Sequence, residues 1–196
     1  EDQQMRRIVV LQMVGLLVAL QGTPLPAEDL TPPGPPGSAE AQMKSLNQIE
    51  PRTAIEQLPY SITNSGAYYL TGSLNGVAGS NGVLITCSDV RLDLNRFALI
   101  GTAGSLNGVD IAAGVNNVTI QDGVIRNWGG SGIMGTNATD SYLISVTVRT
   151  NGFAGGGSGA RLGNTWFIEN CVFLDNASNG VVVADHCTIQ ETKALR

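Results

Sequence analysis

Five short phrases that recur along the chain constrain its fold more than any other feature. Each phrase is a small polar residue, a glycine and an alternation of apolar residues. They begin at Asn81 (NGVLIT), Asn107 (NGVDIA), Ser131 (SGIMGT), Ser158 (SGARLG) and Asn179 (NGVVVA), at steps of 26, 24, 27 and 21 residues. Near-regular spacing of this length is typical of repeat architectures, in which each unit stacks on the next.

A second strand-like segment follows each phrase, and no helix-period segment separates the two. These segments are VRLDL at Val90, VTIQDG at Val118, YLISVTV at Tyr142, TWFIENCVF at Thr165 and CTIQ at Cys187. The 25 glycines and the low charged fraction of 14% also favour short strands and tight turns. The pattern predicts an all-β fold, a right-handed parallel β-helix of about four to five rungs with an N-terminal cap.

Stacked rungs lie about 4.8 Å apart, so equivalent residues of successive rungs form columns. In the first strands we expect Val83, Val109, Ile133, Ala160 and Val181 to point inward, and Leu84, Asp110, Met134, Arg161 and Val182 to point outward. In the second segments we expect two further columns, Ile120 with Leu143 and Ile168, and Ile125 with Val148 and Phe173. The glycine of each phrase is expected to adopt positive φ at a corner, and the preceding Asn or Ser to hydrogen-bond neighbouring copies.

The part of the chain before the repeats divides into three segments. Residues 1–27 resemble a signal peptide region, with basic residues at Met5–Arg7 and an apolar core at Ile8–Leu20 that is too short for a membrane span. Residues 28–42 read as a Pro-rich linker and 43–80 as the cap, followed by the repeats at 81–196. We therefore expect a secreted or cell-surface protein.

The last repeat begins a second strand at Cys187 and ends soon afterwards. A final rung of this kind leaves an unpaired parallel edge. We expect the β-helix to be C-terminally incomplete, or to self-associate through the uncapped rung.

Charge and residue counts disfavour several classes of protein. A net charge of −5 disfavours nucleic acid or an anionic membrane as a partner. Cys87, Cys171 and Cys187 have no CxxC spacing, so they indicate small buried side chains and neither a disulfide framework nor a metal site. His186 is the only histidine and is expected in a turn. No metal or cofactor is predicted.

Longer stretches carry a family resemblance that covers roughly residues 43–196. LDLNRFALIG (92–101), GVIRNWGGSG (123–132) and NCVFLDN (170–176), together with IEPRTAIEQLPYSITNSGAYYLTG, resemble secreted bacterial right-handed parallel β-helix repeat proteins of the pectate-lyase-like superfamily. The resemblance implies the fold. It does not imply one activity, because this scaffold carries lyases, glycoside hydrolases, esterases and adhesins.

The resemblance directs the search for a site to the outer face of the first strands or their neighbours. Asp110 and Arg161 share the outward column there, two rungs apart, and are the candidate substrate-binding residues, for a uronate or another sugar. An incidental exposed pair is the alternative. Trp128 and Trp166 are candidates for sugar stacking or for packing.

No catalytic residue is predicted from the sequence. The aspartates of the repeats fall in different columns, whereas glycoside hydrolysis needs a close carboxylate pair. Two hypotheses follow. The protein binds extracellular polysaccharide, with cleavage as a lyase or glycoside hydrolase left open; alternatively, it is a structural or adhesive surface solenoid without enzymatic activity.

Overall fold

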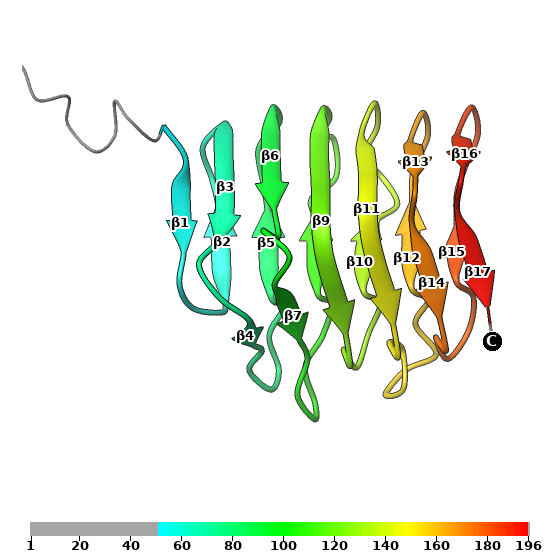
Figure 1. Cartoon of the computed structure of the whole chain (residues 1–196), viewed down its shortest axis with the longest axis horizontal. Coiled ribbons are helices and arrows are strands. Elements are labelled where there is room, and N and C mark those ends of the chain that lie inside the picture. Colours follow the sequence, from blue (N-terminus) through cyan, green and yellow to red (C-terminus); the bar gives the residue numbers. More distant parts are fainter. Residues whose placement is uncertain (1–50, 196) are drawn as a thin grey trace, which may run out of the picture. The chain divides into compact units, whose positions relative to one another are not determined.

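The computed structural model describes residues 51–195, and the protein is there an all-β parallel solenoid of about six turns. Figure 1 shows the strands side by side along the long axis, with successive coils in sequence order. The predicted signal peptide region, the Pro-rich linker and the start of the cap lie outside the described residues.

Each coil contributes to two parallel sheets. Sheet B contains β2 (Tyr60–Ile62), β5 (Val83–Ile85), β8 (Val109–Ile111), β10 (Ile133–Gly135), β12 (Ala160–Leu162) and β15 (Val181–Val182). The main path of sheet A contains β1 (Thr53–Ile55), β3 (Gly66–Leu70), β6 (Val90–Asp93), β9 (Val118–Arg126), β11 (Tyr142–Arg149), β13 (Phe167–Glu169) and β16 (Thr188–Gln190). Sheet A also includes β4 (Leu74–Asn75), β7 (Ala98–Ile100), β14 (Val172–Leu174) and β17 (Lys193–Leu195).

Sheet A bends along its length into two halves. Asp122 in β9 and Ser145 in β11 have φ of 56° and 54°, and both lie at the bend. The first half contains β1, β3, β6, β13, β16 and the starts of β9 and β11. The second half contains β4, β7, β14, β17 and the ends of β9 and β11. Each complete coil therefore presents three outward faces, one from sheet B and one from each half of sheet A.

The predicted inward columns form the core. Val83, Val109, Ile133 and Ala160 are all fully buried, and their strands pair in direct register. The two further columns, Ile120 with Leu143 and Ile168, and Ile125 with Val148 and Phe173, are also in register and buried. Each strand has two inward apolar residues with one outward residue between them, and this pattern predicts correctly which residues of successive rungs lie side by side.

The glycines that precede the sheet B strands are explained by close packing. None of Gly82, Gly108, Gly132, Gly159 and Gly180 has positive φ, so the predicted conformational reason is wrong. A Cβ on Gly108 would lie 2.5 Å from the carbonyl oxygen of Gly132, and one on Gly82 would lie 2.5 Å from that of Gly108. The first four glycines are therefore required because the next rung passes too close for a side chain, and Gly180 instead packs against the side chains of Phe173 and Ala194.

Positive φ occurs instead at non-glycine corners. The corner between sheet B and the first half of sheet A carries it at Asp89, Asn117, Asp140, Thr165 and His186, with φ between 50° and 59°. Asp and Asn tolerate this conformation better than other non-glycine residues, because their short polar side chains bond locally. Asn117 also bonds to the equivalent corner of the preceding rung, where its Nδ2 donates to Asp89 Oδ1 at 2.6 Å.

The turn count exceeds the predicted four to five rungs because part of the expected cap continues both sheets. β2 pairs with β5, with Tyr60 beside Val83, and β3 pairs with β6. Pro59 takes the register position of Gly82, so this coil lacks the glycine phrase on which the repeat count was based. Backbone pairing between rungs requires extended strands and does not require that phrase.

Candidate binding faces

The outward column of sheet B contains the two residues predicted to bind substrate. Asp110, Met134 and Arg161 lie in direct register on β8, β10 and β12. Two rung spacings separate the backbones of Asp110 and Arg161, about 10 Å. The structure therefore places the pair in one column but does not bring it together.

Asp110 is bound to the corner that precedes its strand. Asn81 Nδ2 donates to Asp110 Oδ2 at 2.7 Å, and Asn107 Nδ2 donates to the same oxygen at 3.5 Å. The carboxylate thus accepts one hydrogen bond from the preceding rung and one from its own rung. Arg161, by contrast, is exposed. In this part of the chain Asp110 supports the stacking of coils.

The corner residues of the repeat phrases form a ladder of hydrogen bonds. The backbone N–H of Asn107 donates to Asn81 Oδ1 at 3.0 Å, and that of Ser131 donates to Asn107 Oδ1 at 2.8 Å. The N–H of Ser158 donates to Ser131 Oγ at 3.2 Å. The prediction that the Asn or Ser of the phrase bonds to its neighbouring copy is thus confirmed for Asn81, Asn107 and Ser131, whereas the buried Oγ of Ser158 has no such bond.

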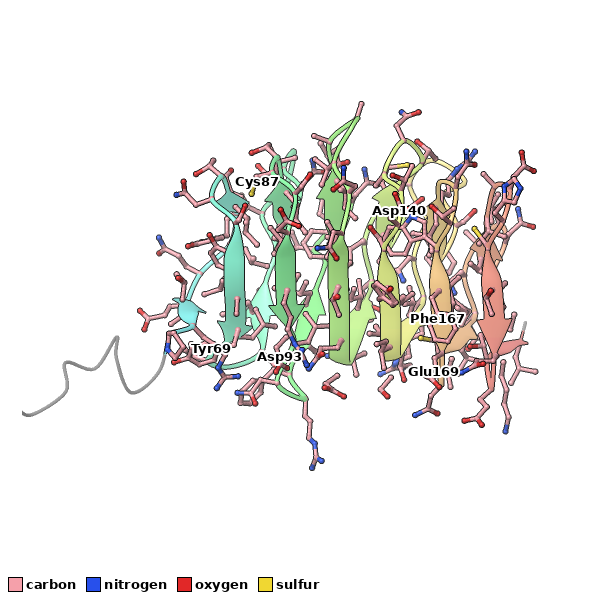
Figure 2. The ribbon with its side chains drawn as sticks, turned by 90° about the horizontal axis from the view of Figure 1, so that it is seen from above. Tyr69, Cys87, Asp93, Asp140, Phe167 and Glu169 are labelled. Atoms are coloured by element: carbon pink, nitrogen blue, oxygen red, sulfur yellow. The ribbon has the colours of Figure 1, made fainter. Side chains whose placement is uncertain are left out.

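The outer face of the first half of sheet A has a different composition. Two columns are fixed by the register of the strands, Ala67–Arg91–Thr119–Tyr142–Phe167–Thr188 and Tyr69–Asp93–Gln121–Ile144–Glu169–Gln190. We call these twelve residues the polar-aromatic face. Figure 2 shows Tyr69, Asp93 and Glu169 from different coils along the same long side of the solenoid.

One end of this face is a network around Asp93. Arg52 Nη1 lies 3.5 Å from Asp93 Oδ2, and its guanidinium lies 4.6 Å from the ring centroid of Tyr69. Gln121 Nε2 also donates to Asp93 Oδ2, at 3.3 Å, and the N–H of Asn95 donates to Oδ1 at 2.7 Å. These contacts hold Asp93 as a hydrogen-bonded carboxylate.

The other end of the face carries two aromatic rings on adjacent rungs. Tyr142 and Phe167 are in direct register, with ring centroids 6.1 Å apart and planes tilted by 54°. Tyr142 is 44% exposed. Beside them Gln190 Nε2 donates to Glu169 Oε1 at 2.6 Å. An apolar ring surface next to amide and carboxylate groups suits a ligand with both apolar and hydroxyl-bearing faces.

A polar hollow of about 210 Å³ lies at the border of the same face. Arg91 and Thr119 line it from the face, and Asp89 and Asn117 line it from the neighbouring corner. Gly66 contributes its bare backbone to the lining. Thr119 is in register with Tyr142, so the hollow and the aromatic pair follow one another along one column.

The carboxylates of the face do not form a pair of glycosidase geometry. Asp93 and Glu169 lie in one column three rungs apart, about 14 Å between backbones. Glycoside hydrolysis uses carboxyl groups about 5 to 9.5 Å apart. Within residues 51–195 no group of His, Cys, Asp and Glu is arranged to hold a metal ion.

Both tryptophans belong to the interior. Trp128 and Trp166 are almost fully buried, and their indole N–H groups donate to the carbonyls of Leu99 and Ala138 at 3.2 and 3.1 Å. They stabilise coils and offer no surface to a sugar. Phe153, on the loop of 150–159, is 67% exposed and lines a second, mostly apolar depression of about 430 Å³.

The cysteines and the histidine have no catalytic arrangement. All three thiols are free, and burial raises the pKa of Cys171, whose Sγ donates to the carbonyl of Glu169 at 3.2 Å. Desolvation also raises the pKa of Cys87, and both thiols stay protonated near neutral pH. His186 is exposed at a corner between β15 and β16, as predicted for a turn residue.

The polar-aromatic face is the site that sequence reasoning missed. The residues predicted from the sequence, Asp110 and Arg161, lie on the first strands, whereas Tyr142 and Phe167 lie on the second segments. Aligning those segments on their inward residues Leu143 and Ile168 places the two rings side by side, so the signal was present.

Comparisons of this chain with protein-family models, curated proteins and solved structures find no match. The fold and its faces therefore define the class of the protein as a parallel β-solenoid with one outward face of aromatic and hydrogen-bonding residues. They do not assign it to a family. In the part of the chain that the structure describes, no helix is long and apolar enough to cross a membrane.

Proposed function

We propose that this protein is secreted and binds extracellular polysaccharide along the polar-aromatic face. The observation that carries the proposal is the order of groups in one column. The polar hollow at Arg91 and Thr119 is followed directly by the exposed ring of Tyr142 and the half-buried ring of Phe167. Sugars present C–H faces that stack on rings and hydroxyls that need hydrogen-bonding partners, and a repeating ligand suits a repeating surface.

The resemblance to secreted bacterial β-helix proteins of the pectate-lyase-like superfamily supports the same proposal. It remains an analogy of fold, which by itself carries no activity. We assign binding and no reaction, because the carboxylates of the face lie too far apart to act on one glycosidic bond.

The experiment is a binding screen with acidic and neutral polysaccharides, with and without calcium, followed by titration calorimetry. We expect one class of polysaccharide to bind, and the double variant Tyr142→Ala/Phe167→Ala to weaken it about tenfold, since two stacking contacts of about 0.5–1.5 kcal/mol are lost. Phe153→Ala is the matched control, because it removes an exposed ring from the other depression.

Two results contradict the proposal. One is the absence of binding across the panel; the other is binding that Phe153→Ala weakens while the double variant does not. Assays for new reducing or unsaturated ends on the same panel test cleavage separately.

The second candidate function is a structural or adhesive solenoid without enzymatic activity. The side-chain bonds between rungs on this face, Gln121 to Asp93 and Gln190 to Glu169, favour it, because they use polar groups to join coils. A protein that binds no polysaccharide and remains a stiff particle by small-angle scattering supports this alternative.

A further inference from the structure

The outward column of sheet B carries two opposite charges at equal distances from its central residue, Met134. Each strand of this sheet contributes one outward residue, and in order these are Ser61, Leu84, Asp110, Met134, Arg161 and Val182. Asp110 lies on the rung before Met134, and Arg161 lies on the rung after it. Leu84 and Val182 lie two rungs away, again on opposite sides.

We propose that this column is a self-complementary surface and that its partner is a second copy of this chain. Two copies face each other across a two-fold axis that runs parallel to the strands and passes between the two Met134 residues. The axis reverses the order of rungs, so Asp110 of each copy lies opposite Arg161 of the other. Leu84 then faces Val182. This is an isologous contact, in which one patch serves both partners.

Other arrangements of the same two faces do not pair the charges. An axis along the column places Asp110 opposite Asp110 and Arg161 opposite Arg161, which is repulsive. An axis parallel to the strands but shifted by half a rung places Asp110 opposite Met134. The Met134-centred axis is therefore the one that charge complementarity selects.

The residues are available for this contact. Arg161 is exposed, and within residues 51–195 it has no ion-pair partner. Asp110 accepts both of its amide hydrogen bonds at Oδ2, and no bond in the described chain uses Oδ1. Leu84, Met134 and Val182 are half-buried in the single chain, so they offer apolar surface at the centre and ends of the column.

The expected dimer is weak. The strands of sheet B contain only two or three residues, so the face is narrow and its contact area lies at the low end of specific interfaces. The surface is distinct from the polar-aromatic face, and the proposal does not depend on polysaccharide binding.

The test is sedimentation equilibrium of the protein from about 1 μM to about 1 mM, a range that brackets weak association. We expect a reversible monomer–dimer equilibrium. Arg161→Glu and Met134→Glu each place like charges across the axis, and we expect each to weaken association at least tenfold. Arg91→Glu, a matched charge reversal on the polar-aromatic face, leaves association unchanged.

A charge-swap experiment makes the test specific. Asp110→Lys and Arg161→Glu are each expected to be monomeric, while an equimolar mixture forms a heterodimer with both pairs restored. Should Asp110→Lys fail to fold because Asn81 loses its acceptor, Arg161→Glu and Met134→Glu carry the test. A protein that stays monomeric at 1 mM, or a dimer that both of these variants leave intact, overturns the proposal.

Discussion

The corner that leads into sheet B and the polar-aromatic face belong to the same coils, yet they differ in how far their residues repeat from rung to rung. At the corner, Asn107 accepts from the backbone of the next rung, Asn151 bonds to the backbone of the preceding rung, and glycines let the rungs approach. On the face, adjacent rungs carry different side chains, such as Thr119, Tyr142 and Phe167. Positions that repeat between rungs therefore hold the stack, and the differing positions of the face are those that we propose to recognise a ligand.

The largest effect that separates the two regions is expected at a corner glycine. In Gly108→Ala the new Cβ would lie 2.5 Å from the carbonyl oxygen of Gly132 and 2.7 Å from Ile125 Cγ2. Because both neighbours are part of the packed stack, we expect a loss of about 3 kcal/mol in the free energy of unfolding, measured by urea denaturation. Gly155→Ala, where nothing lies within 4 Å, is the control and is expected to change stability by less than about 0.5 kcal/mol. Equal denaturation midpoints for the two variants would contradict close packing as the reason for these glycines.

A smaller loss of stability is expected at a buried amide of the same corner. Asn151 is fully buried; its Oδ1 accepts from the N–H of Trp128, and its Nδ2 donates to Asn176 Oδ1 and to the carbonyl of Ile125. Asn151→Ala leaves these partners buried without a bond, which costs about 2 kcal/mol. Asn137→Ala, at an exposed turn position, is expected to be neutral. Thermal unfolding of both variants measures the difference, and an equally small effect at both sites would show that the buried amides do not hold the coils.

The fold could be predicted because its cause is local. Alternating apolar residues and a recurring phrase determine the register, and the column of Ile120, Leu143 and Ile168 follows from them. The coil of β2 escaped the count because it lacks the phrase while its backbone pairs in the same way. The reason for the glycines also escaped, since it depends on the distance to the next rung, which no single phrase contains.

The candidate site could be predicted only in part. The shared column of Asp110 and Arg161 follows from alternation, but the bonds that tie Asp110 to Asn81 and Asn107 do not, since they depend on how the side chains turn at the corner. The pairing of Tyr142 with Phe167 was within reach of the sequence. Both rings lie on the second strand of a rung, one position before the inward residues Leu143 and Ile168 that align the two rungs.

The smallest expected effect compares one carboxylate from each region. Asp110 accepts from Asn81 at 2.7 Å, and Glu169 accepts from Gln190 at 2.6 Å, so the two bonds have similar geometry. The bond of Asp110 is part-buried, and Asn107 donates a second bond to the same carboxylate. The bond of Glu169 is exposed, so water can replace a lost partner. We therefore expect Asp110→Ala to cost about 1 kcal/mol and Glu169→Ala no more than about 0.3 kcal/mol in the free energy of unfolding. Urea denaturation at low micromolar protein, where the proposed dimer is dissociated, measures both. Equal costs at the two sites would mean that the outward carboxylate of sheet B is no more part of the stack than its counterpart on the polar-aromatic face.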